Sequence, residues 1–460
     1  MLRKTVAILL LIVFVKIMLP STVAVANSSF SDFRGVSAML VELETETVLF
    51  EHNARTSHPA DALTTVMTAL LAVEAIDSGV VRDNELITMT EDAWHGLTGS
   101  NLSAPIQSEE RMAFLSLIYA SYLAKANEAS NMIAIRVGGS IDNFVSMMNS
   151  RAREIGLTGT TFTNPTGQHD PNQVTTAYDQ FLLFREALTN PLFYEIAGTF
   201  RHTTEPIDDI PSRTISNTNS LLNQGSRYFY RHSTAGAESS TFYGGRSLIA
   251  YAEEHGMSII GVVLGAGEIL FDDGSVDLLN FTEMVRLLHW GHDNFAWRDV
   301  LRTTDLLERV PILHGAGSDF VNVRPESALT LLLNNDVPTD DFARTITIYS
   351  EVNDEELVAP ITAGTVLGEV VVTRNGIEYA RIPLVANTSI ELHQFEFIRR
   401  NVAEFLTSTT ARNIYIILGL LLTAYLALLI RYHVIRANRA RRIRERRDEI
   451  IRERHESFRE

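Results

Sequence analysis

The chain has 460 residues, of which 45% are hydrophobic and 21% are charged, and its formal net charge at pH 7 is −17. The excess of acidic residues argues against nucleic acid as a partner, because phosphate binding needs a basic surface. The absence of cysteine excludes disulfide bonds and thiolate metal sites. The length exceeds that of one ordinary hydrophobic core, so we expect two domains.

The N-terminal segment predicts export. Arg3 and Lys4 precede a mostly apolar run over residues 6–15, and small residues at 24–26 form a site that signal peptidase can cut. Residues 1–26 are therefore predicted to be a signal peptide. Lys16 is unusual in such a segment, and without cleavage the same run would remain as an N-terminal anchor.

The C-terminal segment predicts a membrane anchor. Residues 414–430 form an uncharged stretch of 17 residues, which is the lower limit for a transmembrane helix. Residues 431–460 then hold 11 Arg against 6 Asp and Glu, and such an excess of positive charge stays in the cytoplasm. We expect a single-pass protein of the cell membrane with an extracytoplasmic ectodomain and a basic cytoplasmic tail. The alternative is a buried core helix followed by a solvated tail.

Residues 27–300 alternate strand-like and helical segments. Residues 37–43 and 48–50 predict one buried hairpin, and residues 247–252 and 257–264 predict another. One helix is expected between the capping residue Thr64 and Gly79, and others over residues 109–126, 128–137, 141–155, 176–188 and 276–288. Because the alternation lacks βαβ regularity, it favours an α+β fold with a largely antiparallel sheet and helices packed on it.

Residues 305–395 have a different pattern, of short β segments. Residues 345–349 and 370–373 are β-branched runs, and Asn375-Gly376 is a strong signal for a two-residue hairpin turn. We therefore expect a small all-β domain between the larger domain and the predicted membrane helix.

Several spaced segments carry a resemblance to a known family. They are GVSAMLVELETETVLFEHNA, ALTTVMTALLAVEA, AKANEASNMIAIRVGGSIDNFVSMMN, GLTGTTFTNPTGQHDPNQVTTAYDQFLL, SNTNSLL and LVAPITAGTVLGEVVV. In this order they resemble the D-alanyl-D-alanine carboxypeptidases of the penicillin-binding-protein type, peptidase family S11. The resemblance implies a serine β-lactamase/D,D-peptidase-like domain with an antiparallel sheet flanked by helices, then an accessory all-β domain and a C-terminal membrane helix. It also implies a role in peptidoglycan metabolism.

Three motifs carry the chemistry of that family. In Ser-x-x-Lys, a serine nucleophile stands one helical turn before a lysine that takes its proton. Ser-x-Asn lines the cleft, and a Lys-Thr-Gly strand edge binds the substrate carboxylate and helps to form the oxyanion hole.

The first motif is altered in this chain. Matching ALTTVMTALL to the family pattern places Ala62 at the serine and Thr65 at the lysine. A shift of one residue, which fits Pro59-Ala60 to the family's Pro-Ala, places Asp61 at the serine instead. Neither register supplies the nucleophile.

The second and third motifs are altered as well. They read Lys125-Ala126-Asn127 and Ala237-Glu238-Ser239, and Lys125 is the only lysine between the predicted signal and the predicted anchor. The substrate-binding strand edge is therefore vestigial by this resemblance, and no catalytic set is intact. If the fold is kept, we expect Lys125 and Glu238 to face each other across the cleft within about 4 Å.

The loss of these groups predicts a large loss of activity. Removing the nucleophile of a serine hydrolase costs on the order of a million-fold in turnover, and removing its base costs a comparable amount. Thr64 or Thr65 with Lys125 as base would be a substitute. A lysine base, however, needs burial or a cationic neighbour to lower its pKa, and Glu238 would act in the opposite direction.

The histidines do not supply another site. His169 and His232 are expected in ordinary polar surroundings, and His289 and His292 lack further ligands at zinc-binding spacing. We therefore expect neither a metal nor a cofactor.

Three functions remain open at this point. The favoured one is a catalytically inactive member of the family that binds peptidoglycan, its stem peptides or a protein of wall synthesis whose identity is unknown. The second is an active serine-type D-Ala-D-Ala carboxypeptidase that trims stem peptides. The third is a purely structural ectodomain.

Overall fold

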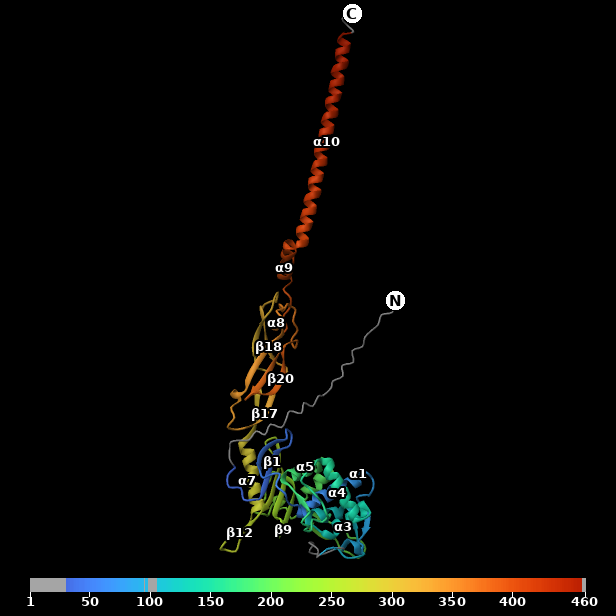
Figure 1. Cartoon of the computed structure of the whole chain (residues 1–460), viewed down its shortest axis with the longest axis vertical. Helices are drawn as coiled ribbons and strands as arrows, with labels where there is room; N and C mark the ends of the chain where they lie inside the picture. Colours follow the sequence, from blue (N-terminus) through green and yellow to red (C-terminus); the bar gives the residue numbers. More distant parts are fainter. Residues whose placement is uncertain (1–29, 95, 98–105, 457–460) are drawn as a thin grey trace. The chain divides into compact units, whose positions relative to one another are not determined.

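The computed structural model of the chain describes residues 30–94, 96–97 and 106–456 (Figure 1). The predicted signal peptide lies outside the described residues. The chain divides into two compact units. The first runs to Arg298 and includes Leu332–Pro338, and the second comprises Asp299–Leu331 and the chain from Thr339 onward.

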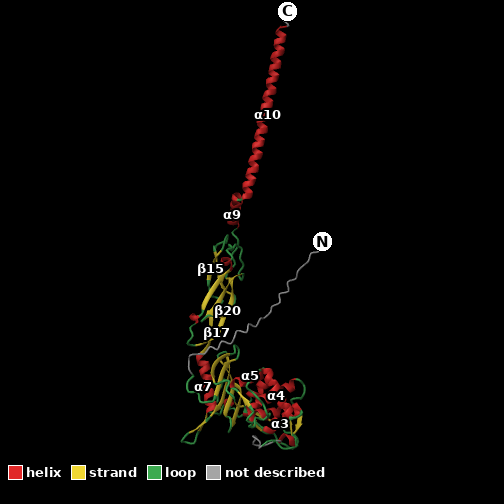
Figure 2. Cartoon of the chain, in the orientation of Figure 1, coloured by secondary structure: helices red, strands yellow, loops and turns green. Residues whose placement is uncertain are grey.

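A five-stranded antiparallel sheet forms the centre of the first unit (Figure 2). Its strand order is β2-β1-β11-β10-β9, so strands from the beginning and the end of the unit lie side by side. The two predicted hairpins are confirmed as β1–β2 and β10–β11. The strand bounds are β1 (Ser37–Glu42), β2 (Thr47–His52), β9 (Ser233–Thr241), β10 (Gly245–Glu254) and β11 (Met257–Ala266).

Helices cover both faces of this sheet. Successive side chains of a strand point to opposite faces, and on β10 Leu248 and Ala250 pack in one cluster with α7 (Leu279–Asn294). Ile249 and Tyr251 belong to the other cluster, which holds the remaining long helices. Figure 1 shows α7 on one side of the sheet and α1, α3, α4 and α5 on the other. The α+β fold expected from the sequence is therefore present.

The helices of the second cluster begin and end at recognisable caps. Ser140 accepts a hydrogen bond from Asn143 N and Gly156 ends the same helix in the left-handed conformation, which explains why the predicted bounds 141–155 are confirmed. Thr176 caps the next predicted helix in the same way. The helix bounds are α1 (Thr64–Asp77), α2 (Phe114–Ala124), α3 (Asn127–Gly138), α4 (Ile141–Ile155), α5 (Ala177–Leu188) and α6 (Pro191–Gly198).

Three expectations on helices need correction. The helix predicted over residues 109–126 begins later, because β5 (Arg111–Ala113) pairs with β4 (Leu86–Thr88) before α2 starts. The helix predicted from residue 276 also starts later, because β13 (Val276–Leu278) pairs with β12 (Glu268–Leu270). Helix α6 was not predicted, although its start carries a capping Asn190 and a proline in the first turn.

Short elements connect these parts of the first unit. They are the two-stranded pairs β3 (His58–Pro59) with β6 (Val174–Thr175) and β7 (Arg201–Thr203) with β8 (Thr214–Ser216), and the 3₁₀ turns η1 (Asp61–Leu63), η2 (Glu91–Trp94) and η3 (Ser220–Leu222).

The second unit contains an antiparallel five-stranded sheet in the order β15-β16-β20-β19-β18. The predicted hairpin turn is confirmed, because Asn375 and Gly376 have φ values of +52° and +78° between β19 and β20. The bounds are β15 (Glu308–Pro311), β16 (Phe320–Pro325), η4 (Thr339–Asp341), β18 (Ala343–Ile348), α8 (Tyr349–Val352), β19 (Val366–Arg374) and β20 (Ile377–Ala386). Strands β14 (Phe295–Leu301) and β17 (Leu329–Asn334) each contain residues of both units.

Two helices end the chain. Helix α9 (Gln394–Thr407) precedes α10 (Thr409–Glu456), which contains the predicted span 414–430. The segment Thr409–Asp448 of α10 has a mean hydropathy of 2.3 in its most apolar window and is long and apolar enough to cross a membrane. Length and composition thus make α10 a candidate anchor.

The loop that precedes β6 packs closely against the start of α1. Thr68 Oγ1 donates to Pro165 O at 2.7 Å, and Gly167 lies so close to Asp61 that a Cβ on Gly167 would be 2.1 Å from Asp61 O. Gly167 also has a φ of +80°. Two separate constraints, the positive φ and the close backbone contact, therefore require glycine here.

These two constraints can be separated by substitution. Gly274 has a φ of +81°, but a Cβ there would meet nothing within 4 Å. We expect Gly274→Ala to cost about 1–2 kcal/mol for the left-handed backbone alone. Gly167→Ala should cost about 2 kcal/mol more, because the backbone of Asp61 must move.

Urea unfolding followed by tryptophan fluorescence measures the difference, since Trp94, Trp290 and Trp297 all belong to the first unit. Equal costs for the two variants would show that the contact between Gly167 and Asp61 does not constrain the fold.

Candidate functional site

The three altered motifs meet in the first unit. Ala62 lies in η1 just before α1, Lys125 follows the last residue of α2, and Ser239 is on the edge strand β9. Ala62 N donates a hydrogen bond to Ser239 Oγ at 3.2 Å, which joins the first and third motifs. Tyr122 OH donates to Gly236 O at 3.0 Å, which joins the end of α2 to β9. The fold therefore assembles a site from residues that the resemblance assigns to one cleft.

The conformation of Asp61 explains why two alignments fitted the first motif. Pro59 is held in β3, and Thr68 is held in α1 by its bond to Pro165. Between them Asp61 has a φ of +43°, an uncommon value for a residue other than glycine. We infer that Asp61 is one additional residue accommodated by this turn. The Pro-Ala match and the helix match are then compatible, and both leave Ala62 at the position that the resemblance assigns to the nucleophile.

Asp61 also fastens the tip of the β9–β10 hairpin. Its buried carboxylate accepts a hydrogen bond from Thr241 Oγ1. Gly244, in the same hairpin turn, lies against this carboxylate, because a Cβ on Gly244 would be 1.9 Å from Asp61 Oδ2. His58 Nε2 lies 2.8 Å from Gly244 O and adds a second contact to the turn. Asp61 and His58, which precede the first motif, therefore position strand β9, which carries the third motif.

Ala62 is the accessible residue at the start of α1. Within residues 61–70, all of which the structure describes, Ala62 is partly exposed and the other nine are buried. A methyl group therefore occupies the accessible position at which the family's nucleophile is expected. The backbone N–H of Ala62 is already used by Ser239 Oγ. Asn127, the first residue of α3, is partly exposed as well.

Lys125 makes a direct contact with Thr65. The Lys125 side chain is 6% exposed, and its Nζ donates to Thr65 Oγ1 at 3.0 Å. Thr65 Oγ1 in turn donates to Ala62 O at 2.8 Å. The ammonium group also lies 4.8 Å from the centroid of the Tyr122 ring, a geometry that favours a cation. An amine and a hydroxyl therefore meet in the cleft, with the amine at position 125 and the hydroxyl at position 65.

Burial dominates the electrostatics of Lys125. It lowers the pKa of Lys125 to about 8, although the Glu238 carboxylate acts in the opposite direction. Glu238 thus acts on the pKa of Lys125 in the direction expected from the sequence, but the burial of the ammonium group has the larger effect.

Glu238 is the second buried charge of the site. Burial raises the pKa of Glu238, while the charge of Lys125 and a hydrogen bond from Thr218 lower it. Lys125 and Glu238 therefore influence each other's pKa through their charges. The ammonium group donates a hydrogen bond to Thr65, and the approach of Lys125 to Glu238 within about 4 Å stays a prediction.

Thr64 and Ala237 are buried beside the site residues described above. Thr64 is fully buried, and its Oγ1 has no hydrogen-bond partner among the described residues. Ala237, at the family's lysine position, is 1% exposed and packs in the core cluster with Ala235. Thr218 lies within the SNTNSLL segment and Thr241 lies two residues after the third motif, although neither residue was singled out from the sequence.

The histidines lie outside these three motifs. His169 stacks on Tyr243 with ring centroids 3.6 Å apart. His232 and His292 contact the carboxylate of Glu254 at 3.3 and 3.5 Å. In the part of the chain that the structure describes, no group of three or more His, Asp or Glu side chains is arranged to hold a metal ion.

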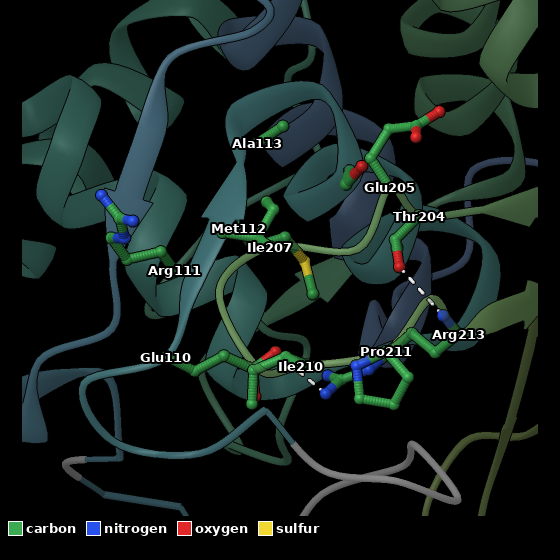
Figure 3. A pocket seen from close by; sticks show the side chains of 11 residues that line it. Glu110, Arg111, Met112, Ala113, Thr204, Glu205, Ile207, Ile210, Pro211 and Arg213 are labelled. Carbon is green, nitrogen blue, oxygen red and sulfur yellow. Dashed lines mark hydrogen bonds and ion pairs between the residues drawn. The ribbon is translucent and has the colours of Figure 1, made fainter.

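A separate small cavity does not compete for the role of ligand site. It lies between β5 and the β7–β8 segment and is lined by Glu110, Met112, Ile207 and Arg213 among others (Figure 3). Its volume of about 40 Å³ is close to that of one water molecule. Glu110 and Arg213 form an ion pair of 2.9 Å across it. The cavity is therefore too small to hold a peptide.

The depressed pKa of Lys125 predicts a specific pH dependence of stability. In the folded chain Lys125 releases its proton near pH 8, whereas in the unfolded chain it does so near the ordinary value of 10.5. Between these values the unfolded chain binds more protons, so the free energy of unfolding rises with pH. Lys125→Met removes this contribution at similar volume. The stability of the natural chain relative to Lys125→Met should therefore increase from pH 7.5 to 9.5, by roughly 1–2 kcal/mol.

Urea unfolding of both chains at several pH values measures this difference. Arg136→Met is the control, because the Arg136–Glu85 ion pair is partly exposed and arginine does not titrate in this window. A Lys125→Met difference that is as flat with pH as the control would contradict the depressed pKa.

Comparison with known proteins identifies the family. The family model for D-alanyl-D-alanine carboxypeptidase, Peptidase S11, matches residues 23–268. D-alanyl-D-alanine carboxypeptidase DacF from Bacillus subtilis is 25% identical over 374 residues, which cover 80% of this chain and 89% of DacF. D-alanyl-D-alanine carboxypeptidase DacC from Escherichia coli is 26% identical over 358 residues, which cover 77% of this chain and 83% of DacC.

Solved structures show the same fold. Penicillin binding protein 5 from Haemophilus influenzae superimposes with a TM-score of 0.55 at 22% identity, covering 79% of this chain and 99% of that protein. PBP3 from Streptococcus pneumoniae, described as a peptidoglycan synthesis regulatory factor, superimposes with a TM-score of 0.56 at 21% identity. The match covers 78% of this chain and 100% of PBP3. Since the family model matches more than half of the sequence, the chain belongs to the D-alanyl-D-alanine carboxypeptidase family, peptidase S11.

Proposed function

We propose that this protein is a membrane-anchored, extracytoplasmic member of the family that binds peptidoglycan stem peptides without hydrolysing them. The relatives are D-alanyl-D-alanine carboxypeptidases, which supports a ligand from the cell wall. The single observation that carries the absence of hydrolysis is the methyl group of Ala62 at the partly exposed nucleophile position. A methyl group has no lone pair with which to form an acyl-enzyme.

The surroundings of Ala62 support the same proposal. Loss of the nucleophile alone costs on the order of a million-fold in turnover. In addition, the backbone N–H of Ala62 is engaged by Ser239 Oγ at 3.2 Å, so this donor is not directed at a substrate carbonyl. Thr65 cannot act as a substitute nucleophile on a bound peptide because it is fully buried.

The anchor and its orientation complete the proposal. Helix α10 is a candidate membrane span, and the residues that follow its apolar part are rich in arginine. Moving that many arginines through a bilayer is unfavourable, so we place the tail in the cytoplasm and both compact units outside the membrane.

Two alternatives predict other outcomes. An active carboxypeptidase would form a covalent adduct with penicillin and release D-alanine. A purely structural ectodomain would do neither and would not bind peptidoglycan. Ala62 and Asn127 are partly exposed, so a ligand can reach these two motif positions, which favours a binding role over a structural one.

The first expected outcome concerns covalent chemistry. The full-length natural chain in membranes should show no mass increase on incubation with a fluorescent penicillin, because position 62 lacks an atom to acylate. Penicillin binding protein 6B from Escherichia coli, a structural relative with a TM-score of 0.56, is the positive control. An adduct of one penicillin on Thr64, Thr65 or Ser233 would refute the proposal in favour of an active enzyme.

The second expected outcome concerns binding. The full-length protein in detergent should sediment with purified peptidoglycan, and much less with glycan strands from which the stem peptides have been removed. Asn127→Arg should weaken sedimentation by placing a long side chain at the cleft mouth. Asn84→Arg is the matched control on an exposed loop of the same unit. Sedimentation that is absent, or equal for both variants, would favour the structural alternative.

A further inference from the structure

An amine and a hydroxyl group are in contact at the site, although they stand at different motif positions from those that the resemblance implies. In the resemblance, the amine belongs to the position of Thr65 and a hydroxyl belongs to the position of Lys125. Here the two groups are exchanged and still touch, with Lys125 Nζ 3.0 Å from Thr65 Oγ1. The exchange moves the amine from the helix of the first motif to the end of α2.

The backbone of Lys125 indicates that this amine is held in place by more than helix propensity. Lys125 has a φ of +57° and a ψ of +39° at the C-cap of α2, where glycine is the residue that incurs no steric cost. Such a conformation costs lysine on the order of 1 kcal/mol, and burial of its ammonium group adds a desolvation cost. The hydrogen bond to Thr65 and the charge of Glu238 offset part of these two costs.

The amine is linked to Ala62 by a short chain of hydrogen bonds. Lys125 Nζ donates to Thr65 Oγ1, and Thr65 Oγ1 donates to Ala62 O at 2.8 Å. A hydroxyl group on the side chain of residue 62 would therefore stand on the same turn as Thr65. Its proton could pass to Lys125 directly or through the Thr65 hydroxyl.

We infer that Lys125 is a general base without a nucleophile, and that the missing hydroxyl at position 62 is the group that separates this cleft from acyl transfer. The inference rests on the proposed function, because it names the reason for the absence of hydrolysis. It differs from the sequence-based interpretation, in which the nucleophile and the base were both lost.

The step that the inference implies is balanced. In an Ala62→Ser variant, the new hydroxyl oxygen attacks the β-lactam carbonyl carbon, an O–C bond forms and the lactam C–N bond breaks. The hydroxyl proton passes to neutral Lys125 and is then given to the departing lactam nitrogen. Because burial lowers the pKa of Lys125 to about 8, roughly a tenth of the molecules hold the neutral amine at pH 7.

Ser239 is a second obstacle that the test must take into account. Its Oγ accepts the hydrogen bond of Ala62 N, so it occupies a donor that would otherwise stabilise the developing oxyanion. Ser239→Gly removes this hydroxyl. We therefore test Ala62→Ser both alone and together with Ser239→Gly.

The probe is a fluorescent penicillin added to the full-length protein in membranes. Ala62→Ser, or its combination with Ser239→Gly, should form one adduct per chain, mapped to position 62, at least 100-fold faster than the natural chain. The rate should rise with pH up to about 8 as the amine loses its proton. Adding Lys125→Met should slow the reaction by about 10²–10⁴-fold, which is the usual contribution of a general base.

The controls separate this inference from folding and from the proposed function. Ala62→Ser adds one oxygen at a partly exposed position, and circular dichroism checks that each variant is folded. The inference is overturned if the folded Ala62→Ser chains give no adduct with or without Ser239→Gly. It is also overturned if the rate is unchanged by Lys125→Met or by pH. An adduct on the natural chain would instead refute the proposed function, so the two failures are distinguishable.

Discussion

The burial of the Lys125 ammonium group is the constraint around which the cleft is arranged. A buried charge is costly unless other groups compensate for its lost hydration. Here the compensation comes from the Thr65 hydroxyl, the face of the Tyr122 ring and the charge of Glu238. The three partners come from α1, α2 and β9, so the cost of burying one amine links the elements that form the site. Removal of any one partner leaves the amine with less compensation.

The backbone contacts around Asp61 provide the rigidity that this arrangement needs. Gly167 and Gly244 approach Asp61 so closely that a Cβ on either would overlap with it. Close contact of this kind leaves little freedom for the start of α1 or for the tip of the β9–β10 hairpin. The positions of Thr65 and Ser239 relative to each other therefore follow from contacts outside the cleft. A site of interlocking hydrogen bonds depends on such support, because an error of about 1 Å breaks them.

The sequence predicted correctly those elements whose bounds depend on neighbouring residues. The bounds of α4 and the Asn375-Gly376 turn follow from caps and from residues that accept a positive φ, and both are confirmed. The start of α2 was wrong because the pairing of β5 with β4 is a contact between segments 25 residues apart, which periodicity does not show. In the site, the convergence of the three motifs was predictable from the resemblance. The contact of Lys125 with Thr65 was not, because the direction of the side chain depends on the left-handed backbone at the end of α2.

Hydrogen bonds within the protein occupy several of the polar groups at the three motif positions. An enzyme keeps polar groups poised toward a substrate, and such sites are commonly destabilising. In this chain Ser239 Oγ accepts from Ala62 N, and Thr65 is bonded to both Lys125 and Ala62. Groups that a reacting substrate would have used are thus satisfied within the protein. Under the proposed function, the methyl group at position 62 offers no atom to acylate, so a bound stem peptide would stay intact.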